Sequence, residues 1–182
     1  MAKKILIAYF SKPGENLIDD QIVDIGPEGN TARVAKKLQD KLSFLDIEAD
    51  LFEIKPLLPY PNSYNECNER ARQEKESLAK PLLEDGPTKF DFYDIVFLGY
   101  PNWWATIPGP ILSFLDNHDF AGKTIVPFVT HGGHIFAYSL EDIAHAAPKA
   151  KMLKGFAVAA SYLGQSDNII ADWLSENHGE LD

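Results

Sequence analysis

The sequence contains a single cysteine, Cys67, in 182 residues. One thiol excludes an internal disulfide and a metal site built from cysteines. Basic residues are also scarce, because 17 Lys and Arg accompany 27 Asp and Glu, for a formal net charge of −10. This balance argues against nucleic acid, since phosphate binding needs clustered cations. It also argues against an anionic membrane surface, and it is compatible with a basic protein partner.

Long hydrophobic runs are missing as well. The N-terminal apolar run at residues 5–10 is far shorter than the roughly 20 residues of a membrane-spanning helix, and too short for the core of a signal peptide. Together with the scarcity of cysteine, this favours a reducing cytoplasm and no membrane contact. The length suits one domain with its own core, and no linker interrupts it, so we predict a single domain over residues 1–182.

Short apolar segments alternate strictly with amphipathic ones along the chain, which predicts alternating strands and helices. Continuously apolar strands in this order indicate an α/β fold, with a parallel sheet covered by helices on both faces. The expected strands lie at residues 4–10, 48–56, 93–101, 123–133 and 152–160. The expected helices lie at residues 30–42, 64–80, 108–117, 139–147 and 166–177.

Two helices carry further local predictions. Ser139 and Asp142 have the spacing of a capping box at the start of the fourth helix. In the helix over 64–80, Tyr64, Cys67, Ala71 and Leu78 form a thin apolar stripe. We interpret Cys67 as a residue without a functional role.

Ligands of a doubly wound sheet bind beyond the carboxyl ends of its strands. The first candidate stretch there joins Ser11 to Gly29, Asn30 and Thr31 at the start of the first helix. Free N–H groups at a helix N-terminus bind phosphate. Asn30 and Thr31 are equally suited to capping the helix alone, and the residues leave that alternative open.

The second stretch, "GYPNWWATIPGP", places Trp103 and Trp104 beside Pro101 and Asn102. An indole offers a flat face to a planar ring. The alternative is that both tryptophans fold back over the core. Two adjacent tryptophans at a strand end favour a ligand surface.

The third stretch, "THGGHIFAY", brings Thr130, His131, Gly132 and Gly133 to the end of the fourth strand. Consecutive glycines let backbone N–H groups approach a ligand closely. His131 and His134 are three residues apart, but no nearby carboxylate or thiol completes a zinc site, so we predict no metal. A phosphate site, an aromatic surface and a polar glycine-rich edge together suit a phosphorylated heteroaromatic ligand such as FMN.

These motifs, "AYFS", "GNT", "GYPNWW", "THGG" and "SLEDI", occur in this order at strand ends between residue 3 and about residue 175. In this the sequence resembles the flavodoxin family, and in particular its bacterial flavodoxin-like branch. The resemblance implies a three-layer flavodoxin-like sandwich, with a five-stranded parallel sheet of order 2-1-3-4-5 and FMN as cofactor.

The resemblance also implies roles for the three stretches. One loop after the first strand wraps the FMN phosphate in flavodoxins, and here we expect it to be split between Ser11 and the Asn30–Thr31 pair. Residues 12–28, which are rich in carboxylates, would then fold outward. Residues 101–104 would flank the flavin ring, and residues 130–133 would line its pyrimidine edge. His131 would either be protonated and stabilise a reduced anionic flavin, or remain a neutral imidazole, which we favour.

The sequence shows no catalytic acid–base pair or nucleophile, which favours electron transfer to a redox partner with a basic docking face. The alternative is an FMN-dependent NAD(P)H oxidoreductase of quinone or flavin reductase type, which a homodimer would suit. A response-regulator-like module without cofactor is a third alternative. It would need an acidic cluster where the first strand instead ends in Tyr9, Phe10 and Ser11.

Overall fold

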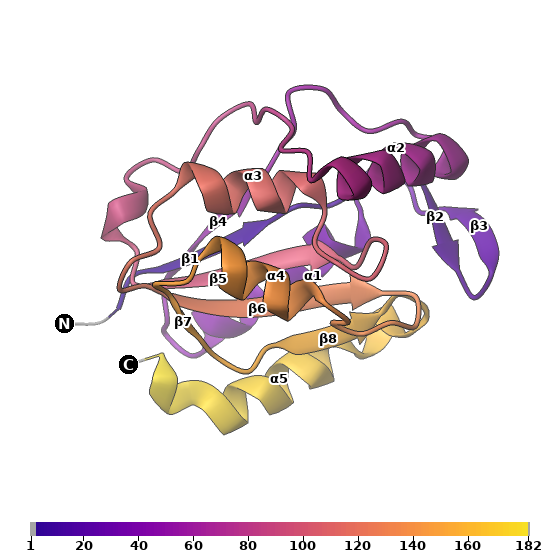
Figure 1. The fold of residues 1–182 in the computed structure, drawn as a ribbon. Helices are drawn as coiled ribbons and strands as arrows, with labels where there is room; N and C mark the ends of the chain where they lie inside the picture. The colour runs from indigo at the N-terminus through magenta and orange to yellow at the C-terminus, as the bar shows by residue number, and fades with distance from the viewer. Residues whose placement is uncertain (1–2, 182) are drawn as a thin grey trace.

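The computed structural model describes residues 3–181, in which a parallel sheet carries helices on both faces (Figure 1). Among these residues, no helix combines the length and the apolar character needed to cross a membrane. The strands of the sheet are β1 (Ile5–Tyr9), β4 (Ala49–Glu53), β5 (Ile95–Pro101), β6 (Thr124–His131), β7 (Lys151–Met152) and β8 (Phe156–Ala159). The helices are α1 (Asn30–Phe44), α2 (Tyr64–Ser77), α3 (Gly109–Asn117), α4 (Ser139–Ala146) and α5 (Ser166–Asn177).

The strand order is β4-β1-β5-β6, followed by β7 and β8, which both pair with β6. Counted along the chain, this is the order 2-1-3-4-5, so the predicted flavodoxin-like order is confirmed. The fifth strand is interrupted, whereas the sequence predicts it as continuous. Gly155 lies in the gap, where a Cβ would come within 2.0 Å of the Pro127 carbonyl oxygen of β6. Since Pro127 has no N–H to offer a neighbouring strand, the ladder breaks opposite it.

Two hydrophobic cores lie on opposite faces of the sheet. All five residues of β1 are buried, and successive side chains of a strand point to opposite faces. The odd-numbered residues of β1 pack in one core with α1 and α5, and the even-numbered residues pack in the other with α3 and α4. This double burial explains why the strands have no polar alternation in the sequence.

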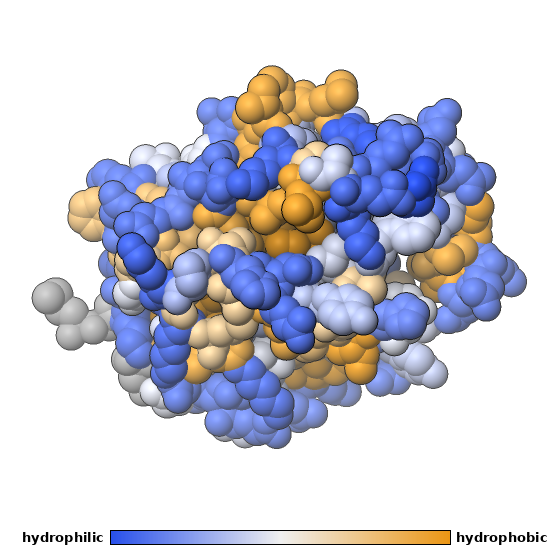
Figure 2. Space-filling view, viewed as in Figure 1, coloured by the Kyte–Doolittle hydropathy of each residue, from blue (hydrophilic) through white to orange (hydrophobic). Residues whose placement is uncertain are grey.

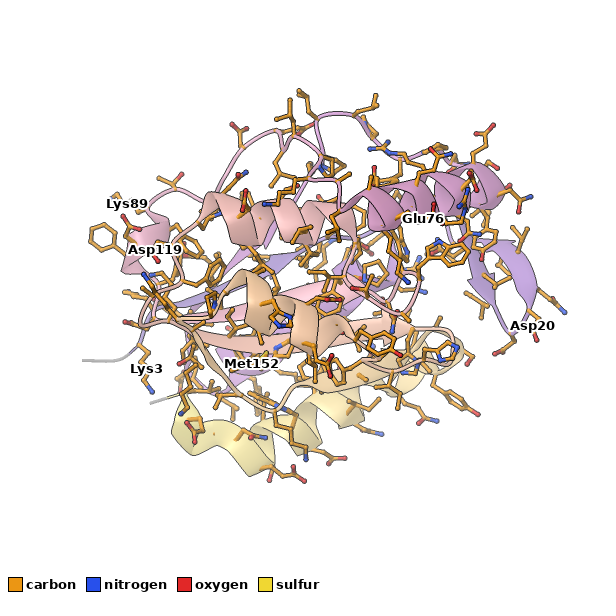
Figure 3. The ribbon with its side chains drawn as sticks, in the orientation of Figure 1. Lys3, Asp20, Glu76, Lys89, Asp119 and Met152 are labelled. Carbon is orange, nitrogen blue, oxygen red and sulfur yellow. The ribbon has the colours of Figure 1, made fainter. Side chains whose placement is uncertain are left out.

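Residues 15–24 form an antiparallel hairpin of β2 (Glu15–Ile18) and β3 (Gln21–Asp24), which lies beside α2 beyond the end of the sheet (Figure 1). Asp19 and Asp20 both have positive φ, as a two-residue hairpin turn requires, and Asp20 lies at the tip (Figure 3). The apolar side chains of the hairpin are partly at the surface, at the right of Figure 2. The tip of the hairpin therefore extends outward, as the sequence predicts. The start of the inserted segment 12–28 does not.

Two local predictions are wrong. Leu78 does not extend the apolar stripe of α2, because it follows the end of the helix with φ +51° and is 75% exposed. Ser139 and Asp142 do not form a capping box. The Ser139 hydroxyl donates to the Phe136 carbonyl at 2.6 Å, and the Asp142 carboxylate accepts from the Thr106 hydroxyl. Both side chains therefore fix α4 to preceding loops and leave its own first turn uncapped.

Candidate functional site

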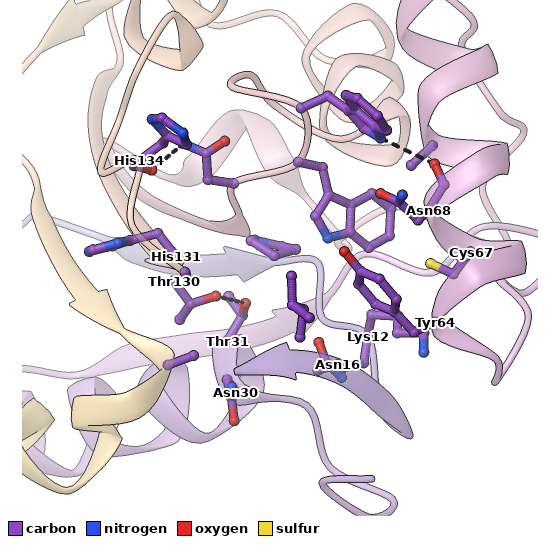
Figure 4. A pocket seen from close by; sticks show the side chains of 18 of the residues that line it. Lys12, Asn16, Asn30, Thr31, Tyr64, Cys67, Asn68, Thr130, His131 and His134 are labelled. Atoms are coloured by element: carbon purple, nitrogen blue, oxygen red, sulfur yellow. Dashed lines mark hydrogen bonds between the residues drawn. The ribbon is translucent and has the colours of Figure 1, made fainter. Parts of the chain in front are cut away.

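A pocket of about 390 Å³ lies at the carboxyl ends of β1, β5 and β6 (Figure 4). All three sequence stretches contribute to it, and three predicted site residues, Ser11, Gly29 and Gly133, lie outside its lining. The predicted site residues that do line the pocket are Asn30, Thr31, Pro101, Asn102, Trp103, Trp104, Thr130, His131 and Gly132. The role of these residues in ligand binding stays a prediction.

Ser11 and Gly29 bring the two ends of the inserted segment together behind the pocket. The Ser11 hydroxyl accepts a hydrogen bond from the Ala32 N–H at 3.0 Å, so it caps α1 from a distant position in the sequence. Gly29 packs so tightly here that a Cβ would lie 2.3 Å from the Ser11 hydroxyl oxygen. The chain thus leaves the sheet at Ser11 and returns to the same point at Gly29.

Thr31 and Thr130 connect the first and third stretches. Their hydroxyl oxygens are 2.8 Å apart, and the two residues are only 1% and 4% exposed. Asn30 is also buried, and within residues 3–181 its side-chain amide has no hydrogen-bond partner. The start of α1 therefore presents one uncommitted polar side chain to the pocket.

The two tryptophans of the second stretch have different environments. Trp103 is partly buried and packs edge-on against Phe10 and Tyr60, with ring centroids 5.3 and 5.0 Å away. Trp104 is 41% exposed, and its indole N–H donates to the Asn68 carbonyl of α2 at 3.1 Å. The Trp103 indole therefore covers the core, and the Trp104 indole lies beside the pocket against α2.

The turn that carries Trp104 is strained. Trp104 and Ala105 have φ values of +53° and +65°, in the left-handed region that non-glycine residues avoid. Backbone hydrogen bonds between Trp103 and Thr106, of 3.2 and 3.0 Å, close this turn. Strain of this kind clusters at functional sites, where the surrounding structure holds it in place.

The third stretch is held by hydrogen bonds within the loop. The Asn102 side chain donates to the carbonyls of His134 and Ile135, so this predicted ring-flanking residue fixes the loop. The Gly133 N–H donates to Nδ1 of His131 at 3.1 Å. Burial lowers the pKa of His131, which favours the neutral ring with its proton on Nε2. His131 thus offers a neutral N–H rather than a positive charge.

The sequence reasoning missed the opposite side of the pocket, which the inserted segment and α2 build. We call this side the α2–hairpin wall. The sequence predicts that residues 12–28 fold away from the site, and this is wrong for Lys12, Glu15, Asn16 and Leu17, which line the pocket. The wall consists of Lys12, Glu15, Asn16, Leu17, Tyr64, Cys67, Asn68 and Ala71. The sequence shows the helical spacing of Tyr64, Cys67, Asn68 and Ala71. It does not show that this face of α2 lies opposite the hairpin across the pocket.

Lys12 ties the hairpin to α2. It is only 7% exposed, and its ammonium group donates to the carbonyls of Glu15 at 2.7 Å and Asn62 at 2.8 Å. Burial lowers the pKa of Lys12. The Glu15 carboxylate in turn accepts from the Tyr64 N–H at 2.8 Å, at the start of α2. The charged groups of the wall therefore hold its two parts together.

Cys67 is a free, buried thiol in this wall. Burial raises its pKa to about 11, partly opposed by nearby Lys12 and Arg70, so the thiol is protonated at neutral pH. The interpretation of Cys67 as a residue without a functional role stays a prediction, although its side chain forms part of the pocket surface.

Comparison with known proteins gives the family. The model of the flavodoxin family matches residues 4–177, and the chain therefore belongs to that family. No curated protein matches the sequence.

Solved structures of similar fold cover nearly the whole chain. A protein described as a flavoprotein from Bacteroides eggerthii is 29% identical, with a TM-score of 0.73 over 96% of this chain and 97% of that one. A second, from Bacteroides uniformis, is 25% identical, with a TM-score of 0.72 over 94% and 99%. A flavoprotein from Lactobacillus acidophilus, solved with FMN, is 20% identical, with a TM-score of 0.66 over 92% and 99%. At that identity the last shows the fold alone.

Proposed function

We propose that this protein binds FMN in the strand-end pocket and acts as an oxidoreductase on a small molecule that enters the same pocket. The observation that carries the proposal is the pocket itself, which is lined on one side by three strand-end stretches and on the other by the α2–hairpin wall. Family membership and the FMN complex of the Lactobacillus acidophilus protein support the choice of cofactor.

The residues on the strand-end side fit FMN. The first turn of α1 supplies backbone N–H groups without intrahelical partners, and Asn30 adds a side-chain amide without a protein partner. These groups would hold the phosphate. The flavin ring would contact the Trp104 indole and the loop at His131 and Gly132. Bound FMN would supply the chemistry of accepting and donating electrons.

This chain's own residues would then bind, orient and exclude water. The hydrogen bond between Thr31 and Thr130 would hold the phosphate end of the site in a fixed position relative to the ring end. The neutral His131 would donate a hydrogen bond from Nε2 to whichever acceptor lies beside it. The α2–hairpin wall would limit access of water to the ring from its own side of the pocket.

The wall is also the reason that we favour a reaction with a small molecule over electron transfer to a partner protein. A partner protein needs an exposed cofactor edge, whereas a walled pocket suits a small substrate. Electron transfer to a basic partner remains the second candidate, because the net charge of −10 would favour docking of a positively charged surface.

Turnover without a partner separates the two candidates. The FMN-loaded protein is mixed with NADPH and a small quinone, and NADPH oxidation is followed by absorbance. Quinone-dependent oxidation above the rate of free FMN supports the small-molecule oxidoreductase. An FMN-loaded protein that shows no such rate, but passes electrons to a basic redox protein, favours the second candidate.

Two asparagines at the ends of the inserted segment test the phosphate site. The Asn16 amide already donates to the carbonyls of Lys12 and Gly14, while the Asn30 amide has no protein partner. We expect Asn30→Ala to weaken FMN binding about tenfold, as the loss of a hydrogen bond to a charged group implies, and Asn16→Ala to have a much smaller effect. Equal losses in a fluorescence titration would reject the split phosphate site.

A further inference from the structure

Two polar side chains of α2 point into the pocket without protein partners. Tyr64 and Asn68 lie one helical turn apart, and Figure 4 shows the Tyr64 hydroxyl directed toward the middle of the pocket. In the described part of the chain, neither the Tyr64 hydroxyl nor the side-chain amide of Asn68 has a hydrogen-bond partner. Polar groups in such partly buried positions normally form hydrogen bonds, so a bound ligand would supply the partners that these two side chains lack.

The charges of the wall disfavour an anionic ligand there. The Lys12 ammonium is held by two backbone carbonyls, and the Glu15 carboxylate lies in the same wall. The Tyr64 phenol stays protonated, because burial raises its pKa. The wall therefore offers neutral donors beside a fixed carboxylate, which suits an uncharged ligand with oxygen acceptors.

The remaining surface of the wall is apolar. Leu17 and Ala71 line the pocket together with Cys67, whose thiol is protonated. The exposed indole of Trp104 lies against α2 at the same side, through its hydrogen bond to Asn68. A flat apolar ring would cover Leu17, Cys67 and Ala71 while its edge reached the donors of α2.

We propose that the α2–hairpin wall binds the second substrate, an uncharged planar ring of the quinone class, whose oxygen accepts hydrogen bonds from Tyr64 and Asn68. The inference rests on the proposed function, because it assigns the strand-end side of the pocket to FMN. It names the class of substrate and the two side chains that select it.

Calorimetric titration of the oxidised, FMN-loaded protein with duroquinone tests the assignment. Both partners are oxidised, so no electrons move, and the fully methylated ring leaves no free position for thiol addition by Cys67. We expect saturable binding that Tyr64→Phe and Asn68→Ala each weaken about fivefold, which corresponds to one hydrogen bond. Benzoate, an anionic ring, should bind at least about tenfold more weakly than duroquinone.

Matched controls are available on the same protein. Asn65→Ala changes an exposed asparagine of α2 outside the pocket, and Tyr138→Phe changes an exposed tyrosine outside it. Neither should change duroquinone affinity, and the FMN content of every variant is read from its absorbance.

The outcomes distinguish the two proposals. A wild-type protein that takes up no FMN overturns the proposed function and this inference with it. A protein that takes up FMN, but binds duroquinone equally in the Tyr64 and Asn68 variants and the controls, overturns the inference alone. Parallel loss of FMN and duroquinone in Tyr64→Phe would assign Tyr64 to the cofactor and also overturn it, as would benzoate binding as tight as that of duroquinone.

Discussion

The hydrogen bond between Thr31 and Thr130 offers a quantitative test of how the site is assembled. Valine replaces threonine with nearly the same shape, so Thr31→Val or Thr130→Val removes one hydroxyl and leaves the other buried without its partner at 2.8 Å. Such an unsatisfied group costs about 1–3 kcal/mol. For a chain of this size, we expect each single variant to lower Tm by about 3–8 °C.

The double variant makes the test specific, because it removes both hydroxyls and leaves no unsatisfied partner. Its loss of stability should be smaller than the sum of the single losses by at least about 1 kcal/mol. Urea unfolding followed by circular dichroism gives all four free energies, and Thr88→Val in an exposed loop serves as the control. Additive losses would show that the two hydroxyls act independently, and would refute the proposed link between α1 and β6.

Three other measurements address strain, protonation and thiol reactivity. Ala105→Gly should raise Tm by about 1–4 °C, because glycine adopts the φ of +65° without the left-handed penalty; a lower Tm would contradict the strain. Because the folded pKa of His131 is lowered from 6.5, the stability that its neutral form contributes is present above pH 6.5 and is lost as the pH falls through the folded pKa. Urea unfolding between about pH 5 and 8 should therefore show a smaller acid-induced loss for His131→Gln than for the wild type, and an unchanged loss would contradict this sign. With its pKa near 11, Cys67 should react with iodoacetamide at pH 8 about a hundredfold more slowly than an exposed cysteine, and comparable rates would contradict its burial.

The features predicted correctly from the sequence depend on local patterns. Continuously apolar strands such as residues 93–101 indicate burial on both faces, and the alternation with helices then leaves few topologies. The position of the pocket follows from the same logic, because the loops after parallel strands meet at one edge. The sequence alone therefore assigns Asn30, Trp104 and His131 to one edge of the sheet, and all three line the pocket there.

The features that were missed depend on contacts between distant residues. The sequence places Ser11 beside the start of α1, nineteen positions later, but it does not show that the Ser11 hydroxyl caps that helix. Asp142 has the spacing of a capping box, but it binds Thr106 because tertiary structure brings that hydroxyl close. The face of α2 that carries Tyr64 and Asn68 looks like an ordinary packing stripe until the hairpin is placed opposite it.

Equilibrium binding of FMN to the purified protein is the most direct test of the strand-end pocket. FMN fluorescence is followed as protein is added, with riboflavin, which lacks the phosphate, as the comparison ligand. We expect fluorescence quenching that saturates at one FMN per chain, and weaker binding of riboflavin because it cannot use the start of α1. Unchanged FMN fluorescence at a large excess of protein would contradict the proposed cofactor site.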